Sequence, residues 1–197
     1  MHAPFYFILT ANHHAIFKNV GIKPIDYPYY DPRTIGLDFE GFLSALRNAI
    51  PRSIFLLHAC AHNPTGVDPT EKQWETIANV ILEKGHFAFF DCAYQGFASG
   101  DLDKDAGAVR YFVERKVPVL VCQSFAKNAG LYGERVGALH VVAASKDEAA
   151  RVKSQLSVLQ RSEISNPPSH GARLVRFSFS SSFFLSCCSR HSSVPLG

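Results

Sequence analysis

The chain has 197 residues, of which 47% are hydrophobic and 19% are charged, a composition typical of a globular domain rather than of a disordered chain. The net charge is only +3, from 20 basic and 17 acidic residues, so neither a nucleic-acid partner nor a membrane-surface partner is expected. No apolar run is long enough to span a bilayer, and residues 1–9 lack the basic segment of a secretory signal.

Strands and helices are predicted to alternate along the chain. A strand is expected over Ser53–Ala59, and Thr70–Gln73 reads as a capping box that opens a helix, which then ends at Gly85. Such alternation favours the α/β class, with a mainly parallel sheet and flanking helices. The further elements expected are strands over 87–91, 117–122 and 137–142, and helices over 105–116 and 146–160.

Polar residues follow three of these strands where each one ends. Asn63 lies in the loop after the first, Asp91 ends the second with Tyr94 three residues later, and Lys127 follows the third. Ligands of open α/β sheets bind at the carboxyl ends of the strands. These four residues are therefore candidates for one site.

The loop around Lys127 indicates which chemistry such a site supports. A lysine amine can condense with a carbonyl group, and the nearby Ser124 and Arg135 suit a phosphate dianion. Pyridoxal phosphate presents an aldehyde and a phosphate together. A carboxylate such as Asp91 can face the pyridine nitrogen of this cofactor and hold the ring as an electron sink, while Asn63 and Tyr94 can hydrogen-bond its phenolic oxygen.

A zinc site at His58, Cys60 and His62 is the alternative for the first loop. The two histidines are four residues apart across a strand-to-loop corner, which is poor ligand geometry, and no Cys-x-x-Cys or His-Glu-x-x-His companion exists. No metal site is therefore predicted. The five cysteines show no disulfide spacing, which favours a reducing compartment.

From about Asn12 to Arg173 the chain resembles class I aspartate aminotransferase, a pyridoxal-phosphate enzyme of fold type I. The segments that carry the resemblance are 58–66, 87–97 and 123–137. The resemblance implies that Lys127 is the Schiff-base lysine and that Asp91 is the partner of the pyridine nitrogen. It further implies that Asn63 and Tyr94 contact the ring oxygen and that Ser124 and Arg135 contact the phosphate. His13 corresponds to a histidine that supports the aspartate from behind the ring.

The same resemblance implies a substrate and a partner. Arg161 corresponds to the arginine that binds the side-chain carboxylate of a dicarboxylic substrate in the neighbouring subunit's site, so the full-length protein is expected to be a homodimer. The implied reaction converts L-aspartate and 2-oxoglutarate to oxaloacetate and L-glutamate. An aromatic-amino-acid aminotransferase of the same class is an alternative. The expected location is the cytoplasm, with the mitochondrion as the alternative.

The two ends of the chain depart from the family pattern. We expect an unmatched segment at 1–11, an incomplete aminotransferase large-domain core at 12–175, and an unstructured low-complexity tail at 176–197 that suggests a splice form, a translated intron or an alternative docking segment. Thr10 stands where the family has a tryptophan that stacks on the cofactor. Because the family's amino-terminal region and small domain have no counterpart here, little activity is expected from the chain alone. A non-catalytic fragment that binds the cofactor or a full-length subunit remains an alternative.

Overall fold

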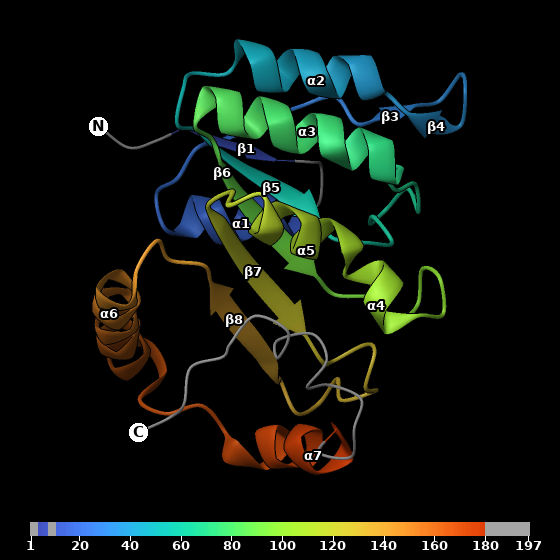
Figure 1. The fold of residues 1–197 in the computed structure, drawn as a ribbon. Helices are drawn as coiled ribbons and strands as arrows, with labels where there is room; N and C mark the ends of the chain where they lie inside the picture. The colour runs from blue at the N-terminus through green and yellow to red at the C-terminus, as the bar shows by residue number, and fades with distance from the viewer. Residues whose placement is uncertain (1–3, 8–10, 180–197) are drawn as a thin grey trace.

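The computed structural model describes residues 4–7 and 11–179, which form a central sheet with helices on both faces (Figure 1). The sheet has the strand order β2-β1-β5-β6-β7-β8, and β3 and β4 form a separate antiparallel pair. Within these ranges no helix is both long and apolar enough to cross a membrane. The strands are β1 (Phe5–Phe7), β2 (Pro24–Asp26), β3 (Tyr30–Asp31), β4 (Gly36–Leu37), β5 (Ile54–His58), β6 (Phe87–Cys92), β7 (Val119–Ser124) and β8 (Gly137–Val141). The helices are α1 (Ala11–Asn19), α2 (Phe39–Asn48), α3 (Glu71–Lys84), α4 (Leu102–Asp105), α5 (Gly107–Glu114), α6 (Lys146–Ile164) and α7 (Ser169–Phe179).

The large sheet is parallel except at β8, which pairs antiparallel with β7. This arrangement confirms the predicted α/β class with a mainly parallel sheet. In register, His58 of β5 stands opposite Asp91 of β6, and Asp91 stands opposite Cys122 of β7. Because paired residues of parallel strands point to the same face, these three side chains share one face near the carboxyl edge of the sheet.

The larger core fills the face covered by α3 and α5, which lie in front of the sheet in Figure 1. The fully buried rings of Phe90 and Phe112 pack edge to face with centroids 5.0 Å apart, and the Trp74 ring lies 5.8 Å from each of them. Buried aromatic pairs of this kind stabilise a core beyond the area that they remove from water.

A smaller core fills the opposite face, beneath α1. Phe5 and Phe7 of β1 are buried there with Leu56, and Phe17 of α1 packs on Phe7 with ring centroids 4.5 Å apart. The sequence did not predict β1 or α1. The strand lies inside the segment 1–11 that was expected to be unmatched, and it occupies the sheet between β2 and β5.

Helix α3 begins and ends where the sequence predicts. The Thr70 hydroxyl accepts a hydrogen bond from the Gln73 backbone N–H at 3.3 Å, and the Gln73 side chain accepts one from the Thr70 N–H at 2.8 Å, which completes the capping box. Gly85 ends the helix in the left-handed conformation, with φ of 63°. Glycine adopts this conformation without the steric cost that a Cβ would bring.

The helix expected over 105–116 corresponds to α5, and the structure adds a short helix, α4, that comes before it and ends at Asp105. The Asp105 carboxylate accepts hydrogen bonds from the backbone N–H groups of Gly96, Ala98 and Ser99, so its side chain organises the preceding loop. The Asp101 carboxylate caps the short α4. A periodic pattern of apolar residues cannot show so short a helix.

The ends of the chain are described only in part. Helix α7 continues to Phe179, four residues into the segment 176–197 that was expected to lack structure. The rest of that segment, and Thr10, lie outside the described residues. The proposed division at 11 and 175 therefore stays a prediction.

Candidate active site

The predicted residues of strands β5, β6 and β7 gather at the carboxyl edge of the sheet. Asp91 is the second-last residue of β6, and Tyr94 lies just after that strand. Ser124 ends β7, and Lys127 lies in the next loop. The α1 helix brings His13 to the same edge, because α1 begins just after β1. The fold thus assembles a carboxylate, an amine, an imidazole and hydroxyl groups from four separate segments.

Asp91 is held by His13. Its Oδ2 lies 3.0 Å from His13 Nε2, and the Asp91 side chain keeps 28% of its surface exposed. Burial by itself would raise the pKa of Asp91, but the hydrogen bond from His13 and the electrostatic interactions with His58, His13 and Lys127 together lower it. The carboxylate is therefore ionised at neutral pH and open to a cation or a protonated ring nitrogen.

Two neutral histidines lie behind this carboxylate. Burial lowers the pKa of His58 to about 4 and that of His62 to about 3. His58 Nδ1 accepts the backbone N–H of Asn63 at 3.3 Å, which puts the ring proton of neutral His58 on Nε2. In the described part of the chain, His58 Nε2 is buried without a hydrogen-bond partner.

His13, His58 and Asp91 are also close enough to hold a metal ion, since their ligand atoms lie within 4.8 Å of one another. The hydrogen bond from Asn63 argues against this use, because a protonated Nε2 of His58 is a donor and offers no lone pair. We therefore interpret His13 as the hydrogen-bond partner of Asp91, and His58 as a neutral imidazole close to both of them.

Lys127 lies against Tyr94. The Lys127 Nζ is 4.6 Å from the centroid of the Tyr94 ring, a distance typical of a cation–π contact, and both side chains are partly buried. The charge of Lys127 contributes to the lowered pKa values of Asp91 and His58, so the amine belongs to the same electrostatic environment.

A cavity of about 410 Å³ opens beside Asp91, and Ser124 and Arg135 are among the residues that line it. The Ser124 hydroxyl accepts the backbone N–H of Ala126 at 3.2 Å. Arg135 is exposed, has a φ of 50°, and donates a hydrogen bond from Nη1 to the Tyr132 carbonyl at 3.0 Å. A left-handed backbone is costly for arginine, and residues held in this way cluster at binding sites.

The Asn63 loop is positioned by a residue that sequence reasoning missed. The Asp68 carboxylate accepts the backbone N–H groups of Ala61 at 2.6 Å and His62 at 2.9 Å. Asn63 itself is exposed and does not line the cavity beside Asp91. The only signal in the sequence is an aspartate shortly after a Pro-Thr-Gly turn, and many loops contain one.

The structure does not bring Arg161 to this group of residues. Arg161 lies on the exposed surface of α6, which stands beyond the β8 edge of the sheet in Figure 1, and its guanidinium hydrogen-bonds the Ser165 hydroxyl at the end of the same helix. Any role in substrate binding would therefore be played at a site other than the one in its own chain.

Comparisons with known proteins agree on one family. The family model described as "Aminotransferase class I and II" matches residues 7–187. A curated relative, the mitochondrial aspartate aminotransferase P2 of Lupinus angustifolius, is 57% identical over 165 residues, which cover 84% of this chain and 36% of the relative. The cytoplasmic aspartate aminotransferase of Saccharomyces cerevisiae is 56% identical over 172 residues, covering 84% of this chain and 41% of the relative.

A solved structure gives the same result for the fold. The aromatic-amino-acid aminotransferase of Burkholderia pseudomallei, covalently bound to pyridoxal phosphate, has a TM-score of 0.85 at 46% identity, covering 88% of this chain and 44% of that one. The chain thus spans less than half the length of the relatives that it matches.

Proposed function

The chain belongs to the family of class I and II aminotransferases, and from this membership we propose that it forms part of an aspartate aminotransferase that uses pyridoxal phosphate. The observation that carries the proposal is the amine of Lys127 beside the ring of Tyr94, at the same sheet edge as the ionised Asp91. This edge is where α/β folds bind their ligands.

The residues of the site fit the cofactor's chemical groups. Asp91 suits the protonated pyridine nitrogen, and Ser124 and Arg135 line one cavity with it and suit the phosphate. Its volume of about 410 Å³ is within the usual range for a small-molecule site. In the described part of the chain, the buried Nε2 of His58 and Oδ1 of Asn128 have no partner, so polar groups near the site are free to meet a polar ligand.

Each residue then has a definite task. Pyridoxal phosphate, when bound, supplies a sink for the electron pair left at the substrate's α-carbon. Lys127 Nζ would attach the cofactor and, when released, would take up the proton of the α-carbon as a general base. Asp91 would keep the ring nitrogen protonated, and His13 would keep Asp91 ionised and oriented. Asn63 and Tyr94 would hydrogen-bond the ring oxygen.

The proposed substrates are aspartate and 2-oxoglutarate. The names of the lupin and yeast relatives support them, and Arg161 would bind the side-chain carboxylate of a dicarboxylic substrate. An aromatic-amino-acid aminotransferase is the second candidate, because the Burkholderia structure is also similar along most of this chain. The two candidates differ in the pocket for the substrate side chain.

We further propose that the whole protein is a homodimer. Arg161 is exposed on α6 and is not among the residues that gather at the site of its own chain, which supports a role in a second copy's site. For the same reason we expect little turnover from the isolated 197-residue chain, and a non-catalytic polypeptide that binds the cofactor or a full-length subunit remains the alternative. The relatives' names include mitochondrial and cytoplasmic forms, so the cytoplasmic location stays a prediction.

Cofactor attachment tests the proposal without requiring turnover. The purified chain is incubated with pyridoxal phosphate, reduced with borohydride and digested, and the labelled peptides are identified by mass spectrometry. We expect the label on Lys127, its loss in Lys127→Ala, and its retention in Lys104→Ala, which removes an exposed lysine of α4. A label distributed over surface lysines would contradict the proposal.

A further inference from the structure

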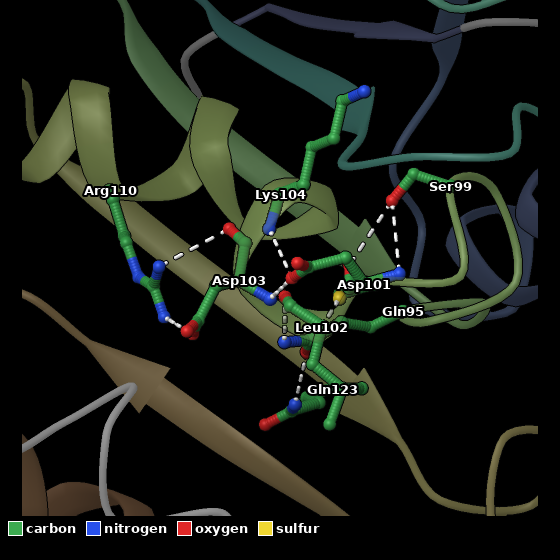
Figure 2. Close-up of polar contacts among 9 residues, drawn as sticks. Gln95, Ser99, Asp101, Leu102, Asp103, Lys104, Arg110 and Gln123 are labelled. Carbon is green, nitrogen blue, oxygen red and sulfur yellow. Dashed lines mark hydrogen bonds and ion pairs between the residues drawn. The ribbon is translucent and has the colours of Figure 1, made fainter.

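A buried glutamine lies beneath the Tyr94 segment, on the face of the sheet opposite the cavity. Gln95 is only 4% exposed, and its neighbour Gln123 of β7, which also borders the cavity, pairs in register with Cys92 of β6. Figure 2 shows the two glutamine side chains meeting between β7 and the loop that leads into α4. A buried amide destabilises a protein unless its donors and acceptors are satisfied, so its partners are informative.

The side chain of Gln95 joins three segments. Its Nε2 donates to the Leu102 carbonyl at 3.0 Å, and its Oε1 accepts from Gln123 Nε2 at 2.7 Å (Figure 2) and from the Cys92 thiol at 3.7 Å. The other end of the Gln123 amide is fixed by His140 of β8, whose Nε2 lies 3.0 Å from Gln123 Oε1. The group therefore links β6, β7, β8 and the start of α4 through directional bonds.

Both glutamines, and the asparagine that contacts Gln95, stand next to residues of the proposed cofactor site. Gln95 follows Tyr94, and Gln123 precedes Ser124. Asn128 follows Lys127, and its Nδ2 donates to the backbone carbonyl of Gln95 at 3.4 Å. Because the Gln95 side chain is bonded to β7 and its backbone carbonyl to the Lys127 loop, a shift of Gln95 would move Tyr94 relative to Ser124 and Lys127.

We propose that Gln95 is a positioning residue, which holds the Lys127 amine over the Tyr94 ring by tying the loop after β6 to β7 and to the Lys127 loop. The proposal rests on the function proposed above, since it concerns the lysine that would attach the cofactor. Gln95 does not line the cavity, so it acts through the backbone of its neighbours. Small displacements of such groups have large effects on reactivity, because attack requires close approach and alignment.

The test compares Gln95→Met with the wild-type chain. Methionine has a similar length and removes the side-chain hydrogen bonds to Leu102 and Gln123 with little change of volume, while the backbone carbonyl that Asn128 contacts remains. In the cofactor-free chain, the rate at which a small amine-reactive reagent modifies Lys127 is measured against the rate at the exposed Lys153 in the same digest. We expect Lys127 to react several-fold faster in the variant, and we expect borohydride-fixed pyridoxal phosphate at Lys127 to fall by about tenfold.

Two comparisons separate positioning from loss of stability. Val80→Ala destabilises the buried face of α3 without touching the glutamines. It should leave both the relative modification rate of Lys127 and the amount of cofactor fixed at Lys127 within about twofold of the wild type. Gln123→Met should reproduce the effect of Gln95→Met, and the double variant should be no worse than either single one, because the two residues act through one bond. Asn128→Ala, a milder change in the Lys127 loop, should shift both ratios in the same direction.

Unchanged ratios in Gln95→Met, additive effects in the double variant, or an equal change in Val80→Ala would each overturn the proposal. Failure of the wild-type chain to bind pyridoxal phosphate at Lys127 would instead refute the proposed function. The reagent measurement would still report on positioning in that case, because it needs no cofactor.

Discussion

Helices α3 and α6 show that two regions of this chain are stabilised in different ways. The 14-residue α3 buries Trp74, Ile77, Ala78, Val80 and Ile81 against the sheet, whereas the 19-residue α6 has no buried residue. Both helices have a side-chain cap at the amino end and a basic residue in the last turn. Local signals therefore define both helices, but only α3 is also held by packing.

The difference in packing between α3 and α6 also applies to the residues of the proposed site. Asp91 lies in β6 itself, and the loop of Lys127 follows β7; both strands belong to the packed region, so the core fixes the positions of the two residues. Arg161 sits on α6, where Val158 and Leu159 are 61% and 57% exposed. An apolar helical surface of this kind is commonly an interaction surface, which agrees with the proposed role of α6 in a dimer.

The largest effect should come from the packed region. Phe112→Ala removes a fully buried ring that packs on Trp74 and Phe90, and it should lower the free energy of unfolding by about 3–5 kcal/mol. Leu159→Ala on α6 should change it by less than about 0.5 kcal/mol. Urea titration followed by circular dichroism measures both. Equal losses in the two variants would mean that α6 is packed in solution.

A second prediction contrasts the two regions in catalysis, at the equivalent positions of a full-length relative. Asp91→Asn should lower turnover by about 10²–10³-fold with aspartate and with phenylalanine, because an electrostatic partner of the ring nitrogen serves every substrate. Arg161→Ala should lower turnover by about tenfold to a hundredfold with aspartate only, since it removes a bond to the side-chain carboxylate. Steady-state kinetics with the two amino acids separates these outcomes. An undiminished rate in Asp91→Asn would leave the aspartate with a structural role alone.

The sequence predicts the packed region well because its signals are local. Thr70 and Gly85 delimit α3 through capping chemistry, and continuous apolar runs mark β5, β6 and β7. The strand β1 has only three residues, and its partners in register include Ile54 and Phe55, some fifty positions away. A run that short carries no usable pattern, so its place in the sheet depends on the tertiary fold.

Some residues of the site can likewise be found from the sequence, and others only from the structure. The loop pattern makes Lys127 and Asp91 candidates, the resemblance to a known family implies a role for His13, and the structure adds the distance between His13 and Asp91. Gln95 and Asp68 carry no motif of their own. Their importance follows from what their side chains contact across the loops, and only coordinates show those contacts.

The buried histidines predict a pH dependence of stability that belongs to the packed region. His58 and His62 stay neutral in the folded chain because burial lowers their pKa values to about 4 and about 3, whereas in the unfolded chain they bind protons below about pH 6.5. Stability should therefore fall as the pH drops below 6.5, by about 2 kcal/mol for each histidine at pH 5. The contribution of Asp91, whose pKa is lowered, is lost only at more acidic pH.

Urea midpoints between pH 7 and pH 5 measure this loss. His62→Asn should reduce the slope, while His170→Asn, at an exposed position of α7, should keep the wild-type dependence. A midpoint that does not change over this range in the wild-type chain would show that the two rings are hydrated in solution.

The smallest predicted effect compares the two helix caps directly. Thr70→Ala and Ser145→Ala each remove a hydroxyl that accepts a backbone N–H of the first turn, an interaction usually worth about 1 kcal/mol. Because α3 unfolds with the core, Thr70→Ala should lower the free energy of unfolding by about 1 kcal/mol. Thr70→Gly should lower it by only about a few tenths of a kcal/mol. Because α6 buries nothing, Ser145→Ala should only increase local opening, seen as faster amide hydrogen exchange in α6 with unchanged exchange in α3. If Ser145→Ala instead accelerated exchange in α3 as well, the two helices would belong to one cooperative unit, and the contrast in their packing would not describe how the chain unfolds.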